Sequence, residues 1–221
     1  AFEKAIEIGC EMMEFDVRLT KDHIIVSYHD ECSDEGHKIC DLTFQELNSK
    51  AQIKGFQVPT LEAILKMSQN RIFLDIELKE TGYEKAIVDL VLKYFSYDEF
   101  VMKSFLDVSM IKIRKIDPMI RTGLILGMKN VQFGVLSRLS EVLPVLRILR
   151  ALPAFISPYY KLVLPGPLRK LQFLNLPLLV WTVNDKKTIQ KLLESGVTAV
   201  ITDRPDIGLK VMKKLKRLGR I

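Results

Sequence analysis

The chain has 221 residues, of which 48% are hydrophobic and 27% charged, and its formal net charge is +6. No linker or change of composition divides the sequence, so we expect one domain over residues 1–221 with a sizeable core. The longest uncharged stretch, 171–184, falls short of the ~18 apolar residues of a membrane span. These features exclude a membrane-spanning helix and a disordered chain.

The basic excess is concentrated at the C-terminus, where no acidic residue follows Asp206. Ile207, Val211, Leu215 and Leu218 recur there at helical spacing, which predicts an amphipathic helix packed on the rest of the domain. A weak attraction of its basic face to anionic lipid surfaces is the alternative. We expect no nucleic-acid partner, because no basic stripe with interleaved aromatic residues occurs elsewhere.

Cysteine usage and the N-terminus bear on the cellular location. Three cysteines in a chain of this size favour a reducing compartment, so we expect a cytoplasmic protein. The first residues lack the pattern of a secretory signal, although a chain that begins inside an element can have lost one. A zinc site at Cys32, His37 and Cys40 is a weak hypothesis, because the spacing does not fit the usual close pair. The sequence leaves the oligomeric state open.

Short runs rich in β-branched and aromatic residues alternate with helical patterns along the chain, which is typical of βα units around a parallel sheet. Strands are expected over residues 12–19, 71–79, 100–105, 121–127, 154–160, 178–183 and 199–203. Helices are expected over residues 60–68, 83–94, 108–116 and 186–195. The pattern therefore predicts an α/β fold with a parallel sheet, either a (β/α)₈ barrel or an open sheet.

A further helix is expected over residues 2–8, before the first of these strands. In a (β/α)₈ barrel this helix should itself follow a strand, so the count indicates a barrel that lacks its first strand in this chain. A doubly wound open sheet is the rival architecture. The glycine-rich phosphate turn that often follows a strand in such folds is absent.

Two of the expected strands carry charged residues on one face. Side chains alternate along a strand, so Glu14 and Asp16 share a face, and so do Asp75, Glu77 and Lys79. Burying several unpaired carboxylates is costly, so either a cation lies beside them or some of the acids hold protons, and a bound divalent metal compensates them best. Oxygen ligands without a nearby thiolate favour magnesium or calcium over zinc. The alternative is that these residues face solvent or form salt bridges on edge strands.

A histidine follows the first of these strands, after a turn and a short apolar run. The imidazole of His29 can exchange protons near neutral pH, which makes it a candidate acid or base. An ordinary surface or core histidine is the alternative. That second interpretation applies to His23 and His37.

An ordered series of short motifs runs along nearly the whole chain. The series contains Glu14-Phe15-Asp16-Val17, His29-Asp30, Val58-Pro59-Thr60-Leu61-Glu62, Glu77-Leu78-Lys79, Ser104-Phe105, Trp181-Thr182-Val183-Asn184 and Ile201-Thr202-Asp203-Arg204-Pro205. In this order the motifs resemble those of the glycerophosphodiester phosphodiesterase family. The resemblance implies a TIM barrel that hydrolyses a small-molecule phosphodiester, with a divalent cation, to an alcohol and usually glycerol 3-phosphate.

The resemblance also implies roles for individual residues. Glu14, Asp16 and Glu77 match the family's metal-binding carboxylates. His29 matches one of its two catalytic histidines, and Lys79 matches the lysine near the phosphate.

The expected substrate pocket contains two aromatic residues. Trp181 matches an aromatic residue that lines the family's pocket, and Phe105 of Ser104-Phe105 is expected to bind substrate as well. A phospholipase D-like enzyme acting on lysophospholipids is the alternative function. Apolar residues that would line its lipid-accepting mouth include Val145, Leu146, Ile148 and Leu149. The other interpretation of these residues is that they are helix faces buried on the barrel.

The chain departs from the family pattern at its start. The family's opening strand carries a His-Arg-Gly motif, followed by Pro-Glu-Asn-Thr or a similar sequence, and this chain begins after both. The expectation is an N-terminally incomplete chain, which agrees with the strand count. A non-catalytic barrel that lacks one catalytic histidine is the alternative.

Overall fold

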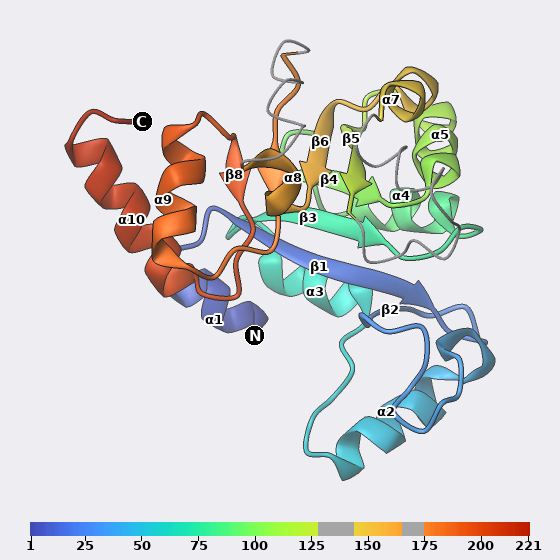
Figure 1. Ribbon diagram of the computed structural model, residues 1–221. Coiled ribbons are helices and arrows are strands. Elements are labelled where there is room, and N and C mark those ends of the chain that lie inside the picture. The colour runs from blue at the N-terminus through green and yellow to red at the C-terminus, as the bar shows by residue number, and fades with distance from the viewer. Residues whose placement is uncertain (128–143, 165–174) are drawn as a thin grey trace.

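The computed structural model describes residues 1–127, 144–164 and 175–221. Parallel strands alternate with helices through these residues (Figure 1). The parallel strands are β1 (Met12–Leu19), β3 (Phe73–Leu78), β4 (Phe100–Ser104), β5 (Thr122–Leu126), β6 (Phe155–Pro158), β7 (Leu179–Val180) and β8 (Ala199–Val200). All seven predicted strands are thus confirmed, mostly with shorter ends. The sequence did not predict β2 (Ile25–Ser27), which pairs antiparallel with the end of β1.

The helices lie between these strands, except for one before β1 and one after β8. They are α1 (Phe2–Glu7), α2 (Phe44–Ile53), α3 (Leu61–Ser68), α4 (Glu84–Leu92), α5 (Asp107–Ile116), α7 (Val145–Ala151), α8 (Tyr160–Val163), α9 (Lys186–Glu194) and α10 (Pro205–Arg217), with a short 3₁₀ helix at Ile39–Asp41. The sequence sets several of the boundaries. The Thr60 side chain caps α3 and the Asp185 side chain caps α9, while Gly196 follows α9 with a positive φ.

The sheet follows the strand order of a barrel, β1-β3-β4-β5-β6, with every neighbouring pair parallel. Isolated bridges join β6 to the β7 region, and β7 pairs with β8. Within the described ranges, β8 is not bonded to β1. The fold is therefore a (β/α)₈-type barrel that is open between β8 and β1.

A groove of about 740 Å³ lies at this opening. It is bordered by α1, the start of β1, β8 and α10, and Figure 1 shows α1 and α10 on this side of the barrel. Its lining includes Phe2, Met12 and Leu209, together with the carboxylates of Glu14 and Asp75. The groove thus separates β8 from β1 in the described part of the barrel.

The core lies between the outer face of the strands and the helices. Phe15 and Ile76 of the strands pack with Ile64 of α3 and Ile87 of α4. On the other side of the barrel a second cluster joins β5–β8 to α9 and α10. Because the apolar faces meet the helices, the acidic faces of β1 and β3 are turned into the barrel.

The C-terminal helix forms and packs as its sequence predicts, except that it ends before Leu218, which is exposed. Val211 and Leu215 of α10 are buried in the second cluster, while its lysines are mostly exposed. Among the described helices, none is long and apolar enough to cross a bilayer.

Candidate functional site

Three carboxylates that the sequence singles out are brought together inside the barrel. Glu14, Asp16 and Glu77 each offer one oxygen, and these oxygens lie within 4.8 Å of one another. The strands explain this proximity, because Asp16 is directly opposite Glu77 in the parallel pairing of β1 and β3. In the described part of the chain, this is the one group of three or more potential metal ligands.

Lys79 places a positive charge among these carboxylates. Its Nζ lies 2.8 Å from Asp16 Oδ1 and 2.5 Å from Glu77 Oε1. Burial acts to lower the pKa of Lys79, but the charges of Glu77 and Asp16 outweigh it and raise the pKa above its ordinary value. Lys79 therefore remains an ammonium ion at neutral pH.

A second buried lysine lies deeper in the barrel. Lys103 Nζ is 2.7 Å from Asp75 Oδ2 and 3.2 Å from Glu14 Oε1. Both Lys103 and Asp75 are almost completely buried. Asp75 Oδ1 has no hydrogen-bond partner among the residues that the structure describes. The alternation along the strand predicts Asp75 on its charged face, whereas no pattern in the sequence indicates Lys103 as its partner.

Burial sets the protonation of this cluster. It raises the pKa of Glu14 to about 7, against the opposing charge of Lys103. Burial likewise raises the pKa of Glu77, against the opposing charge of Lys79. When Glu14, Asp16, Asp75 and Glu77 are all ionised, their four negative charges exceed the two positive charges of Lys79 and Lys103 by two. One divalent cation balances this excess, and the all-oxygen donor set fits magnesium or calcium.

His29 lies two residues after the end of the short strand β2. The preceding residue, Tyr28, donates its backbone N–H to the carbonyl oxygen of Asp16 at 3.2 Å. This hydrogen bond fixes the chain next to His29 against the strand that carries Asp16. The imidazole is 73% exposed, and its Nδ1 lies 2.7 Å from Asp30 Oδ1. An exposed imidazole beside a carboxylate is able to exchange protons with solvent or a ligand.

Arg18 fixes the backbone at His29. Its Nη2 and Nε donate to the His29 carbonyl oxygen at 3.1 and 3.3 Å, and its Nη1 lies 3.0 Å from Glu80 Oε2. Glu80 also accepts a hydrogen bond from the backbone N–H of Leu19 at 2.8 Å. Neither Arg18 nor Glu80 was singled out from the sequence. A signal was present in Val17-Arg18-Leu19, where a charged residue sits between apolar ones on a buried strand.

The two expected aromatic residues are in contact. The rings of Phe105 and Trp181 pack edge to face with centroids 5.7 Å apart, and Tyr159 lies 5.4 Å from Trp181. A Cβ at Gly127 would approach the Trp181 ring to 2.7 Å, so glycine makes room for the indole. These residues follow β4, β5, β6 and β7, at the same carboxyl end of the sheet as Lys79 after β3.

A family model described as "Glycerophosphoryl diester phosphodiesterase family" matches residues 1–207. The chain belongs to this family. The resemblance inferred from the motifs is thus confirmed.

Individual relatives agree over nearly the whole chain. The glycerophosphodiester phosphodiesterase of Caldanaerobacter subterraneus is 28% identical, and the match covers 97% of this chain and 90% of the relative. A crystal structure of the Thermotoga maritima glycerophosphodiester phosphodiesterase is 26% identical with a TM-score of 0.74, covering 96% of this chain and 89% of that chain. An Oleispira antarctica phosphodiesterase in complex with the product sn-glycerol 3-phosphate is 21% identical with a TM-score of 0.77, covering 96% and 89%, and supports the fold.

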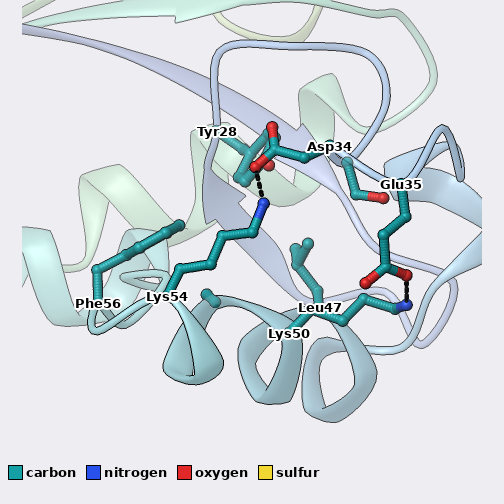
Figure 2. Close-up of a pocket in the computed structure, with 9 residues that line it drawn as sticks. Tyr28, Asp34, Glu35, Leu47, Lys50, Lys54 and Phe56 are labelled. Atoms are coloured by element: carbon teal, nitrogen blue, oxygen red, sulfur yellow. Dashed lines mark hydrogen bonds and ion pairs between the residues drawn. The ribbon is translucent and has the colours of Figure 1, made fainter.

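A small pocket lies between α2 and the loop that precedes it. Tyr28 and Phe56 line it, and Figure 2 shows the lysines of α2 extended toward the loop. Lys54 pairs with Asp34, and Lys50 pairs with Glu35. These two ion pairs hold the loop against α2. Because each lysine is paired with a carboxylate, these four side chains leave no unpaired charge in the pocket.

The weak hypothesis of a zinc site is wrong. Cys32, His37 and Cys40 do not form a group of potential metal ligands. Cys32 instead pairs with Lys38 through a β-bridge, and Cys40 is exposed. The spacing in the sequence had already argued against a close thiolate pair.

Proposed function

We propose that this chain hydrolyses glycerophosphodiesters to an alcohol and sn-glycerol 3-phosphate, with residues 1–221 acting as one domain. Family membership and the names of the relatives support this activity. The observation that carries the proposal is the cluster of Glu14, Asp16 and Glu77 around Lys79. The proposed product is the one bound in the Oleispira antarctica relative.

The residues present fit a divalent cation. Glu14, Asp16 and Glu77 would hold magnesium or calcium, because their oxygens converge and the buried cluster carries an excess of negative charge. When bound, such an ion supplies a positive charge that binds a non-bridging phosphate oxygen and offsets charge developing in the transition state.

The chain's own residues account for the remaining chemistry. Lys79 donates to a second phosphate oxygen, since its ammonium group already lies at the carboxylates. His29 acts as a general acid or base, with its backbone held by Arg18 and its ring oriented by Asp30. Phe105 and Trp181 bind the apolar side of the glycerol or alcohol group and limit the access of water.

Product analysis tests the proposal. The natural full-length protein is incubated with glycerophosphocholine and either magnesium or calcium, and both choline and glycerol 3-phosphate are measured. Equal amounts of the two products are expected. Release of phosphocholine and glycerol in their place would mean that the other ester bond is cleaved, and no product with either ion would reject the activity.

A phospholipase D-like activity on lysophospholipids is a second candidate. Exposed apolar side chains on α7, at Val145, Leu146 and Leu149, favour it. Choline release from lysophosphatidylcholine beside glycerophosphocholine separates the two activities. Faster release from lysophosphatidylcholine would favour this second candidate.

A further inference from the structure

The outward face of α7 is apolar. Leu146 is 81% exposed and Leu149 is 63% exposed, and Val145 and Leu152 are exposed beside them. Val145 and Leu149 are one helical turn apart and form an apolar strip with Leu146 beside it, and Leu152 follows as the left-handed C-cap residue of α7. Ile148 and Ala151 on the opposite face are buried. The interpretation that these residues are buried on the barrel is therefore wrong for Val145, Leu146 and Leu149.

Helix α5 extends this strip. The two helices lie side by side (Figure 1), joined by Arg147 to Asp107 at 2.7 Å and by Arg114 to the Ala151 carbonyl oxygen at 2.9 Å. Val108 is exposed at the start of α5. We define the α5–α7 face as Val108, Val145, Leu146, Leu149 and Leu152.

Helices α5 and α7 carry more basic than acidic residues, although Lys112, Arg114 and Arg147 also bond to Thr81, the Ala151 carbonyl oxygen and Asp107. The basic residues of the two helices are Lys112, Arg114, Lys115, Arg147 and Arg150. The acidic residue of the two helices is Asp107, which is engaged by Arg147. An apolar strip with cationic flanks complements an anionic lipid surface, whereas the core of a protein interface is depleted of charged residues.

The α5–α7 face is attached to the entrance of the candidate site. Arg147 Nη2 donates to the carbonyl oxygen of Phe105 at 2.9 Å, and the Phe105 ring packs on Trp181. A surface that docks through this face therefore lies beside the carboxyl end of the barrel strands.

We propose that the α5–α7 face docks reversibly on an anionic lipid surface. This goes beyond the proposed hydrolysis and does not depend on it. The strip is short, so the contact is weak and combines apolar burial with attraction of the basic side chains. Helix α10 provides positive charge without an apolar outer face, because Val211 and Leu215 pack inward.

Vesicle flotation tests the docking. Vesicles of phosphatidylcholine alone are compared with vesicles of equal parts phosphatidylcholine and phosphatidylglycerol. Wild-type protein is expected to float with the mixed vesicles and to be released by salt. Replacing both Leu146 and Leu149 with serine should lower the bound fraction about tenfold without changing the net charge.

Two further variants sharpen the comparison. Ile53→Ser is the matched control, because Ile53 is 86% exposed on α2, and it should bind as wild type does. Leu149→Trp should bind at least as well, with a blue shift of indole fluorescence on adding mixed vesicles.

Two outcomes would overturn the proposal. The first is undiminished flotation of the double serine variant, and loss of flotation in K213E/K214E would then place the contact on α10. The second is a lipid-free dimer of the wild type that the double serine variant dissociates, because a second copy would then cover the face.

Discussion

The ammonium group of Lys103 lies 2.7 Å from Asp75 Oδ2 and 3.2 Å from Glu14 Oε1, so one buried cation holds carboxylates of two neighbouring strands. Asp75 is almost completely buried and Glu14 is partly buried, and Lys103 is the ammonium group that both contact. The acidic cluster is thus supported from below by Lys103 and from the carboxyl end by Lys79.

Replacing Lys103 with methionine should destabilise the fold. The change leaves a buried carboxylate without its partner, which typically costs about 3–5 kcal/mol in the free energy of unfolding. Urea denaturation measures the loss. The double variant K103M/D75N should recover much of it, because the uncompensated charge is also removed. If K103M were as stable as the wild type, the Lys103–Asp75 ion pair would not contribute to the free energy of unfolding.

Replacing Glu77 with glutamine should weaken divalent-metal binding at least about tenfold, because a neutral amide replaces a charged ligand. Calorimetric titration with magnesium and calcium measures the affinity, and circular dichroism should remain near that of wild type. Glu84→Gln is the control, since Glu84 is a buried carboxylate that bonds to Thr81 and the Gly82 backbone on α4. Unchanged affinity in E77Q would remove Glu77 from the proposed metal site.

His29→Ala should lower turnover by about 10²–10⁴-fold while leaving metal affinity intact, because the imidazole is assigned to proton transfer. Turnover of glycerophosphocholine and calorimetric titration must both be measured on the natural full-length protein. His23→Ala should retain activity. Joint loss of metal binding and activity in H29A would identify His29 as a ligand or a structural residue.

Stability of the metal-free protein should fall as the pH rises from about 5 to about 8. Burial raises the pKa of Glu14 from 4.5 to about 7, and the pKa values of Asp75 and Glu77 are raised too. The folded chain therefore holds protons that the unfolded chain has lost. This stabilisation is complete at a pH below the pKa that Glu14 has in the unfolded chain, and it is lost as the pH rises through the pKa that Glu14 has in the folded chain.

The expected loss is about 2 kcal/mol, or about 4–8 °C in Tm for a chain of this size. Thermal unfolding at several pH values measures it. Glu14→Gln should flatten the profile, and saturating magnesium or calcium should reverse it, because the ion binds the ionised carboxylates. A flat wild-type profile without metal would show that these carboxylates are not held protonated.

The sequence predicted the strands and the acidic faces because both depend on local alternation. Glu14, Asp16 and Glu77 could be grouped for that reason, and the family motifs supplied their expected role. The role of Lys103 could not be predicted, because its pairing with Asp75 depends on the register between β3 and β4, which no local pattern encodes. The orientation of α7 could not be predicted for a related reason. Apolar residues lie on most sides of this helix, including Val145, Leu146 and Leu149, so periodicity does not distinguish its inner from its outer face.

The most direct test of the central claim is a metal add-back experiment with glycerophosphocholine. The natural full-length protein is stripped with a chelator, and glycerol 3-phosphate is measured before and after adding magnesium or calcium. We predict negligible turnover in the stripped protein, recovery in the wild type, and no recovery in E14Q/E77Q. Full turnover after stripping, or equal recovery in the double variant, would contradict the assignment of Glu14, Asp16 and Glu77 as the metal-holding centre of the site.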